Sequence, residues 1–428
     1  MGVRHKSEDL CESPRKRNNL GVLATSVQFT AVATSRAYSD RALSVAKGLK
    51  SARRSRRLKS RCGVPSLLCR TPGQGRNRAR RVCSFACSLA VLLSCLPAAR
   101  PDQLPHLLFG QRIGTDWKPE SEPWMNFVAI SSDGLTVAAN GNVPGGNAPE
   151  LGLWTFPAGE YLRRIAGTPI AISADFRYLA TENSVLDLRT GKPVFQFFRE
   201  QDTITSAAFT LTGDYVALVG GRGTEKGKRT QICVRRTVDG SLVSSFCTRY
   251  TGSLAFHPDG HTLASGHWNN VTLWDVRSGV RLALLAGVPR PVDVNGYDRD
   301  GRYMCGMGFS RDGKVLAAGS DDGEIQLWDV GARKLLHSLK IGWSDVSNPA
   351  FSPDGKLVAA GTYADGTVSL VDVQSGKILS QVQVSMFGCG SVAFSPDGQY
   401  LVTPSNGGEL NDGKHDRGGT IRVFRVVE

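Results

Sequence analysis

The sequence predicts an all-β fold, a seven-bladed β-propeller that spans residues 105–428. Two observations carry this prediction. Seven segments share one pattern of an apolar strand, a tight turn and a second apolar strand, followed by a third strand and a glycine. The turns recur at intervals of 37 to 53 residues, a spacing typical of four-stranded propeller blades.

The seven turns have a chemical explanation. In Ser352-Pro353-Asp354-Gly355 the proline presets φ, the aspartate binds its own backbone and the glycine accepts positive φ. We therefore interpret the repeated Asp-Gly pairs as turns rather than as catalytic carboxylates. The turn position falls at Gly134, Phe176, Gly213, Gly260, Gly313, Gly355 and Gly398.

The third strands carry a family signature. Two of them end in Trp274-Asp275 and Trp328-Asp329, and in this the chain resembles the WD40 repeat family, in particular bacterial members with degenerate repeats. The resemblance implies a propeller but no particular function, because the fold hosts many. The Gly-His dipeptide that often opens such repeats is missing, which weighs against the family's buried Asp-His-Ser-Trp hydrogen-bond tetrad. The dyad is degenerate at Trp154-Thr155, Leu186-Asp187, Arg235-Arg236, Val371-Asp372 and Phe424-Arg425.

The ends of the repeat region predict how the ring closes. The seventh repeat stops at Glu428, just after its third strand, and so lacks a fourth. A strand-like segment from His106 to Ile113 precedes the first repeat. We expect this segment to pair with Thr420 to Val426, because an open sheet edge would invite aggregation.

The net charge of +14 belongs to the N-terminal part of the chain. Residues 1–100 hold 21 Lys+Arg against 4 Asp+Glu, and the other 328 residues hold 31 against 34. Bulk charge therefore does not make the propeller a nucleic-acid binder. Four cysteines after residue 100 do not make a disulfide scaffold.

Residues 1–81 read as a basic leader without apolar periodicity, for which disorder is the expectation. An export signal follows it some 75 residues into the chain, whereas such signals normally begin at the N-terminus. We therefore hypothesise that translation starts downstream, near Val64 or Leu67. N-terminal sequencing that found residues 1–60 in the cellular protein would contradict that start.

Residues 82–99 are an uncharged apolar stretch that follows a basic cluster, the pattern of an export signal or a membrane anchor. Within it, Val91 to Cys95 resembles a bacterial lipobox, which implies Cys95 as the lipidated residue. We expect an exported protein, periplasmic or attached to the membrane and facing outward. A buried core segment, and with it a cytoplasmic protein, is the alternative.

Four long connections fall on one face of the predicted propeller, residues 140–150, 220–229, 286–302 and 404–418. Long loops on a rigid scaffold usually carry binding sites, and insertion without a role is the alternative. Their mixed charges suit a protein or peptide partner of a monomeric chain better than a nucleic acid. The candidate partner-binding residues are Asn142, Asn147, Arg222, Lys226, Lys228, Arg229, Tyr297, Asp298, Glu409, Asp412 and His415.

The sequence favours a non-catalytic interaction platform over an enzyme. The predicted innermost strands contribute no Asp, Glu or His, whereas propeller enzymes usually gather reactive groups around the channel. Phosphate-loop, haem-attachment and paired Cys-x-x-Cys motifs are also missing, so we expect no catalytic residue, metal or cofactor. An enzyme or enzyme subunit with a loop-borne site is the alternative.

Two weaker candidates come from histidines and cysteines. His257, His261 and His267 cluster in one repeat, and we interpret them as surface residues rather than metal ligands. Cys233 and Cys247 are nearly symmetric about a turn and are a candidate disulfide in an oxidising compartment. Two buried free thiols are the alternative.

Overall fold

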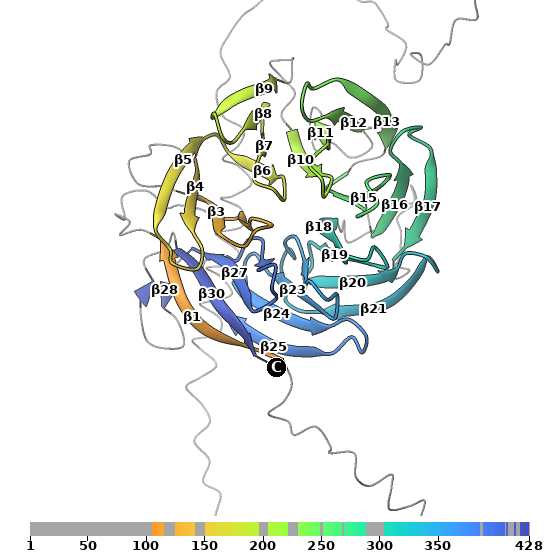
Figure 1. Ribbon diagram of the computed structural model, residues 1–428. Coiled ribbons are helices and arrows are strands. Elements are labelled where there is room, and N and C mark those ends of the chain that lie inside the picture. The colour runs from red at the N-terminus through yellow and green to blue at the C-terminus, as the bar shows by residue number, and fades with distance from the viewer. Residues whose placement is uncertain are drawn as a thin grey trace, which may run out of the picture. The chain divides into compact units, whose positions relative to one another are not determined.

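The computed structural model describes residues 105–114, 125–141, 150–196, 204–220, 230–248, 251–267, 269–287, 304–385, 388–406, 408–409, 415–416 and 420–427. These residues form strands and turns, with no helix among them. Seven antiparallel sheets of four strands stand around a common axis (Figure 1). The all-β, seven-bladed fold expected from the sequence is confirmed.

Each blade runs from an innermost strand to an outermost one in chain order. Blade 1 holds β2 (Val128–Ile130), β3 (Thr136–Gly141), β4 (Glu150–Thr155) and β5 (Tyr161–Ala166). Blade 2 holds β6 (Pro169–Ile172), β7 (Tyr178–Thr181), β8 (Ser184–Asp187) and β9 (Lys192–Gln196). Blade 3 holds β10 (Ile204–Phe209), β11 (Tyr215–Gly220), β12 (Thr230–Arg236) and β13 (Leu242–Thr248).

The next three blades repeat this order. Blade 4 holds β14 (Ser253–Phe256), β15 (Thr262–Gly266), β16 (Asn270–Asp275) and β17 (Arg281–Ala286). Blade 5 holds β18 (Met304–Phe309), β19 (Val315–Ser320), β20 (Glu324–Asp329) and β21 (Lys334–Lys340). Blade 6 holds β22 (Ala350–Phe351), β23 (Leu357–Gly361), β24 (Thr367–Asp372) and β25 (Ile378–Gln383).

Blade 7 is assembled from both ends of the repeat region. Its strands are β26 (Ala393–Phe394), β27 (Tyr400–Ser405), β30 (Thr420–Val427) and, outermost, β1 (His106–Gly114). β1 pairs antiparallel with β30, with His106 opposite Val427 and Ile113 opposite Ile421. The two strands lie side by side at the rim of the ring in Figure 1. The expected pairing of the opening segment with the tail is present.

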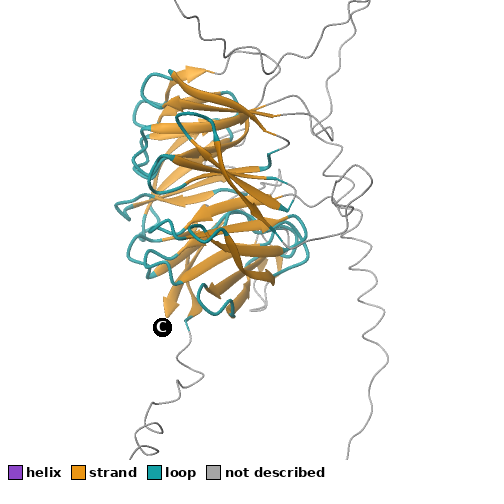
Figure 2. Cartoon of the chain, turned by 90° about the vertical axis from the view of Figure 1, so that its right-hand side faces the viewer, coloured by secondary structure: helices purple, strands orange, loops and turns teal. Residues whose placement is uncertain are grey.

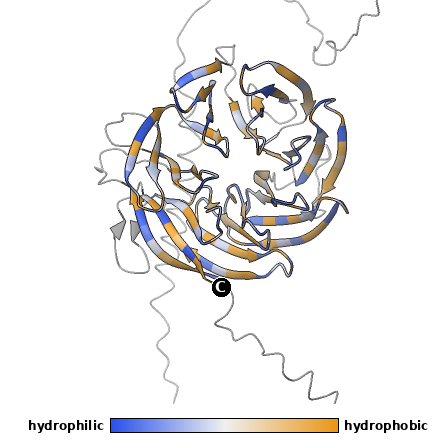
Figure 3. Ribbon diagram, in the orientation of Figure 1, coloured by the Kyte–Doolittle hydropathy of each residue, from blue (hydrophilic) through white to orange (hydrophobic). Residues whose placement is uncertain are grey.

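Burial follows strand position within a blade. The second strands are almost wholly buried, as in β3 and β19, because neighbouring blades cover both of their faces. The outermost strands β17 and β21 alternate between exposed and covered residues, which suits a sheet edge with one wet face. Figure 3 shows this alternation as mixed hydropathy along the outer strands. The core therefore lies between blades rather than at one centre.

One hydrogen bond recurs in all seven turns between the first and second strands. The amide of the turn residue donates to the carbonyl oxygen three residues earlier, at 2.9 Å in every blade. The six glycines at this position have φ between 70° and 74°, a region that costs an L side chain energy. Phe176 alone adopts it with a side chain, at φ 54°. The Asp-Gly pairs are turns, as expected.

The Trp-Asp dyads join the core to the next turn. Trp328 is fully buried between blades, while Asp275 turns outward and caps the connection to the outermost strand. Its Oδ1 accepts hydrogen bonds from the amide and hydroxyl of Ser278 at 2.7 and 2.6 Å. The Asp275 carboxylate thus stabilises the turn that leads to the outermost strand.

The leader of residues 1–81, the apolar stretch of residues 82–99 and Cys95 lie outside the described residues. Among the residues that are described, no helix is long and apolar enough to cross a membrane.

Ring closure makes a stability prediction. Ile113 of β1 is 2% exposed in a cluster with Trp154 and Ile421, whereas Leu108 on the same strand is 49% exposed. Ile113→Ala should therefore lower the free energy of unfolding by about 2–4 kcal/mol and Leu108→Ala by less than about 1 kcal/mol. Chemical denaturation measures both. Deletion of residues 100–114 should abolish cooperative unfolding, and an unchanged melting temperature would refute the closure.

Candidate partner-binding site at the loop face

The propeller has two unlike faces. The short turns after each first strand lie on one face, which we call the turn face. The connections from second to third strands, and from each blade to the next, lie on the other, which we call the loop face. Figure 2 views the ring from the side, with the connections gathered on its two faces. The innermost strands start at the loop face, so its centre is the mouth of the ring.

Most of the sequence-predicted binding residues lie outside the described part of the chain. Glu409 and His415 are the two that fall on described strands, β28 (Gly408–Glu409) and β29 (His415–Asp416). They are opposite each other in this small antiparallel pair, so the backbone brings them together. Outside the described residues are Asn142, Asn147, Arg222, Lys226, Lys228, Arg229, Tyr297, Asp298 and Asp412.

A polar cavity of about 250 Å³ lies at the mouth of the ring. It is built by the residues that open the innermost strands of blades 1, 5, 6 and 7 and by two connections between strands. Because the first residues of several strands and short polar side chains meet there, the cavity is lined by hydrogen-bonding groups and not by apolar side chains. The lining residues are Asn126, Cys305, Asp345, Ser347, Asn348, Tyr363, Gly390 and Ser391.

Burial dominates the electrostatics of this mouth. It raises the pKa of the Asp345 carboxyl, since few groups around it compensate for the lost water. Burial and then the Asp345 charge raise the pKa of Tyr363. The pKa of the Cys305 thiol is strongly raised by burial and then by Asp345, Asp321 and Asp322. The carboxylates therefore impose a negative potential on the mouth.

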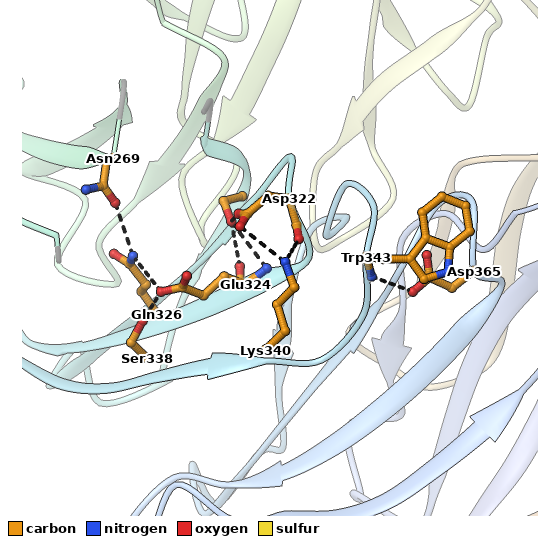
Figure 4. Close-up of polar contacts among 9 residues, drawn as sticks. Asn269, Asp322, Glu324, Gln326, Ser338, Lys340, Trp343 and Asp365 are labelled. Carbon is orange, nitrogen blue, oxygen red and sulfur yellow. Dashed lines mark hydrogen bonds and ion pairs between the residues drawn. The ribbon is translucent and has the colours of Figure 1, made fainter. Parts of the chain in front are cut away.

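A short connection beside the cavity displays an aromatic side chain. Trp343 lies between β21 and β22 and is 63% exposed. Its amide donates to Asp365 Oδ2 at 2.7 Å, and Ser344 Oγ donates to the other oxygen of Asp365, also at 2.7 Å. The amide of Ala364 returns a 2.8 Å hydrogen bond to Ser344 Oγ. The side chain is exposed while its backbone is clamped, and Figure 4 shows the Asp365 carboxylate beside it.

Glycine is required where this connection approaches its neighbour. A Cβ on Gly342 would lie 2.3 Å from Asp365 Oδ2 and 2.6 Å from Thr362 Cγ2. A Cβ on Gly323, at φ 85°, would lie 2.3 Å from the Gly342 oxygen. The clamp that presents Trp343 therefore depends on two close backbone contacts.

A polar ladder continues from this connection into blades 5 and 4 (Figure 4). Lys340 pairs with Asp322 at 3.2 Å. Gln326, 1% exposed, donates to Glu324 Oε1 at 3.1 Å and to Asn269 Oδ1 at 3.2 Å. The ladder fixes the outer strands of blade 5 against blade 4.

The histidine cluster is structural. Trp274 Nε1 donates to Ser265 Oγ at 2.8 Å, and Ser265 Oγ lies 3.0 Å from His267 Nε2. This Trp-Ser-His chain resembles part of the Asp-His-Ser-Trp hydrogen-bond tetrad, which we did not expect because the opening Gly-His dipeptide is missing. Here the histidine follows the second strand of the blade. His257 lies 3.1 Å from the Gly313 carbonyl and packs on Phe309.

The interpretation of these histidines as surface residues was wrong for two of them. His257 and His267 are half-buried at blade contacts, because each ring reaches a neighbouring strand or turn. His261 is exposed. Within the described ranges, no three His, Cys, Asp or Glu side chains form a metal-binding group.

The candidate disulfide between Cys233 and Cys247 is also wrong, because Cys233 is a free thiol. The register of β12 with β13 places Ser245 opposite Cys233 and Gln231 opposite Cys247. The two cysteines are therefore diagonal neighbours, at a distance of about 7–8 Å between Cα atoms that exceeds the usual disulfide span.

A second cavity of about 330 Å³ lies on the turn face between blades 2 and 3. Its lining includes Asp175, Arg177, Asp214 and Arg236, so both signs of charge are present. Asp175 already accepts hydrogen bonds from Ser173 and from the backbone of its own turn. Asp175 therefore uses part of its hydrogen-bonding capacity within its own turn.

Fold and site together define a β-propeller repeat protein with a polar mouth. Comparisons place it more closely. A family model for the "WD domain, G-beta repeat" matches residues 237–275. The WD repeat-containing protein VIP3 of Arabidopsis thaliana is 36% identical over 104 residues, which are 23% of this chain and 32% of VIP3. The WD40 repeat family is thus supported for the propeller.

Two further relatives agree with this family. Pre-mRNA-processing factor 19 homolog 2 of Arabidopsis thaliana is 26% identical over 219 residues, 47% of this chain and 38% of the relative. Periodic tryptophan protein 2 homolog of Schizosaccharomyces pombe is 32% identical over 108 residues, 24% of this chain and 11% of the relative. The chain therefore spans less than two fifths of the length of these curated relatives.

A second family model, the Cytochrome D1 heme domain, matches residues 297–388. The described part of that segment holds one histidine, His337, on the outer strand β21 with its Nε2 3.0 Å from the Gln374 carbonyl. Cys305 at the mouth is held protonated by its raised pKa and is a poor iron ligand. The polar mouth is also smaller than the roughly 300–1,000 Å³ usual for ligand pockets. These residues do not fit a haem.

Trp343, Asp345 and Tyr363 were not predicted from the sequence. They lie in short connections of blades 5 and 6, whereas the predicted binding residues lie in long loops. One signal was available in Gly342-Trp343-Ser344-Asp345, an aromatic and a carboxyl placed outside any apolar strand.

The burial of Asp345 predicts a pH-dependent stability difference. Because its folded pKa is raised above 3.8, ionisation disfavours the fold as pH rises through this range and the penalty is complete at neutral pH. Asp345→Asn should therefore raise the melting temperature at pH 7, and the gain should vanish below about pH 4. Calorimetry across pH measures it. An equal gain at all pH values would contradict the assignment.

Proposed function

We propose that this chain is a non-catalytic protein-interaction platform that binds its partner at the loop face. The observation that carries the proposal is Trp343, exposed for 63% of its surface while its backbone is clamped by Asp365. Tryptophan is enriched among residues that dominate binding energy, and a clamped backbone has little entropy left to lose on binding.

The relatives add support of a general kind. VIP3, which has "WD repeat" in its name, and the matching "WD domain, G-beta repeat" model suggest a scaffold for protein interactions. Because one fold hosts many functions, the choice of face rests on the residues of this chain. The mouth cavity and the Trp343 connection are neighbours on that face through Tyr363, whose amide donates to the Asp345 carbonyl at 2.8 Å.

We place this activity outside the cytoplasm, at the membrane or beyond it, of a bacterial cell. The support is the apolar stretch of residues 82–99 that follows a basic cluster. Fractionation of cells that express the full chain should recover the propeller with the envelope or the periplasm. Recovery in the cytoplasmic fraction would contradict the location and leave the binding proposal intact.

The platform predicts the effect of removing its aromatic side chain. Trp343→Ala should weaken partner capture from envelope extracts by at least about tenfold, since truncating a central aromatic typically costs 2 kcal/mol or more. Leu211→Ala is the matched control, because Leu211 is 58% exposed but lies on the turn face. Quantitative mass spectrometry of captured proteins compares both variants with the wild type.

Equal capture by the two variants and the wild type would contradict a loop-face platform. The enzyme alternative is separated by metal analysis of the purified protein. A stoichiometric bound metal would favour it over the platform.

A further inference from the structure

The charges and aromatic groups of the loop face indicate which kind of partner it binds. This further inference rests on the proposed function. The cavity at the mouth holds Asp345, whose carboxylate makes no ion pair with any described residue. Asp321 and Asp322 lie close enough to act on the Cys305 thiol in the same cavity. Lys340 pairs with Asp322 at 3.2 Å, so the charge that the cavity offers to a ligand is that of Asp345.

An exposed tryptophan lies on the same connection as Asp345. Trp343 is two residues from Asp345, and the residue that clamps it, Asp365, is itself a carboxylate. The face of a tryptophan ring attracts ammonium and guanidinium groups, most strongly when they are partly desolvated. Aromatic and carboxylate groups side by side therefore select the same kind of ligand.

We infer that the mouth cavity receives a lysine or arginine side chain of a basic partner segment, with Asp345 as its counter-charge and Trp343 packed against its stem. The cavity of about 250 Å³ accommodates one long side chain rather than a folded element. Serine and asparagine groups of the lining, including Ser347, Asn348 and Ser391, accept the remaining hydrogen bonds of the cation.

The arrangement also explains why a buried carboxyl is kept at this position. An ionised Asp345 weakens the free protein, but a bound cation would reverse that penalty by supplying the missing charge. The Asp345 carboxylate thus destabilises the free protein and contributes to the binding energy when the partner is bound. A carboxyl with a purely structural role would be expected to have an ion-pair partner among the described residues around it, and Asp345 has none there.

Short peptides of one Gly-Ser background test the inference directly. They carry three arginines, three lysines, three glutamines or three glutamates, and fluorescence polarisation measures binding to the full chain. The arginine and lysine peptides should bind at least about tenfold more tightly than the glutamine peptide, and higher salt should weaken them. Preference for the glutamate or glutamine peptide, or no binding by any peptide, would overturn the inference.

Variants then locate the binding. Asp345→Asn and Trp343→Ala should each weaken the arginine peptide by about tenfold, and Trp343→Phe should recover part of the loss. Glu160→Gln removes an exposed negative charge from the turn face and is the control for bulk charge. Equal weakening by Glu160→Gln, or no effect of Asp345→Asn, would overturn the assignment.

The outcomes are distinguishable from failure of the platform itself. If Trp343→Ala abolishes partner capture while the peptides show no preference for positive charge, the loop face binds a partner but not through a cation. Melting temperatures of the variants show that each remains folded.

Discussion

The antiparallel pairing of β1 with β30 is the contact on which the rest of the structure depends. A propeller blade buries its faces against its two neighbours, so an open ring would expose blade 1 and blade 7 together. The pairing links residues more than 300 positions apart, and Ile113 then packs with Trp154 of blade 1 and Ile421 of blade 7. Such a long-range contact costs chain entropy that only the buried cluster can offset.

Closure also shapes the mouth. Asn126 of blade 1 and Ser391 of blade 7 line the same cavity, and the Val128 amide donates to Ser391 Oγ across the junction at 2.8 Å. The Met125 amide similarly reaches Asn406 Oδ1 at 2.6 Å. The cavity therefore exists only in the closed ring. The stability of the fold and the geometry of the proposed site share one cause.

The mouth of the ring does not follow the regular pattern of burial that the blades share. Each blade repeats the same turn hydrogen bond and the same buried second strand, and each choice of residue agrees with the fold. On the connection between β21 and β22, a carboxyl is half-buried at Asp345 and an indole is exposed at Trp343. When most residues of a structure suit the fold, the few that lower its stability are expected at functional sites.

Sequence reasoning recovers the periodic part of this molecule and little of the rest. Turn residues and strand patterns are local, so the seven Asp-Gly-type turns, the blade count and even the β1 strand could be predicted. The pairing of Cys233 could not, because the turn between β12 and β13 sets a register in which Ser245, two residues before Cys247, lies opposite Cys233. Neither could the meeting of Asp345 with Tyr363 and Cys305, which two connections and the start of β18 bring together from the adjacent blades 5 and 6.

Hydrogen exchange of the amides in β1 tests the central claim most directly. If β1 completes the ring, its amides that pair with β30 should exchange with the same global protection as those of β30 and of the inner strands. Exchange of β1 at the rate of an unfolded chain, beside full protection of the other blades, would show that the ring does not need its opening strand. The conclusion that closure of the ring builds the mouth cavity would then also be wrong.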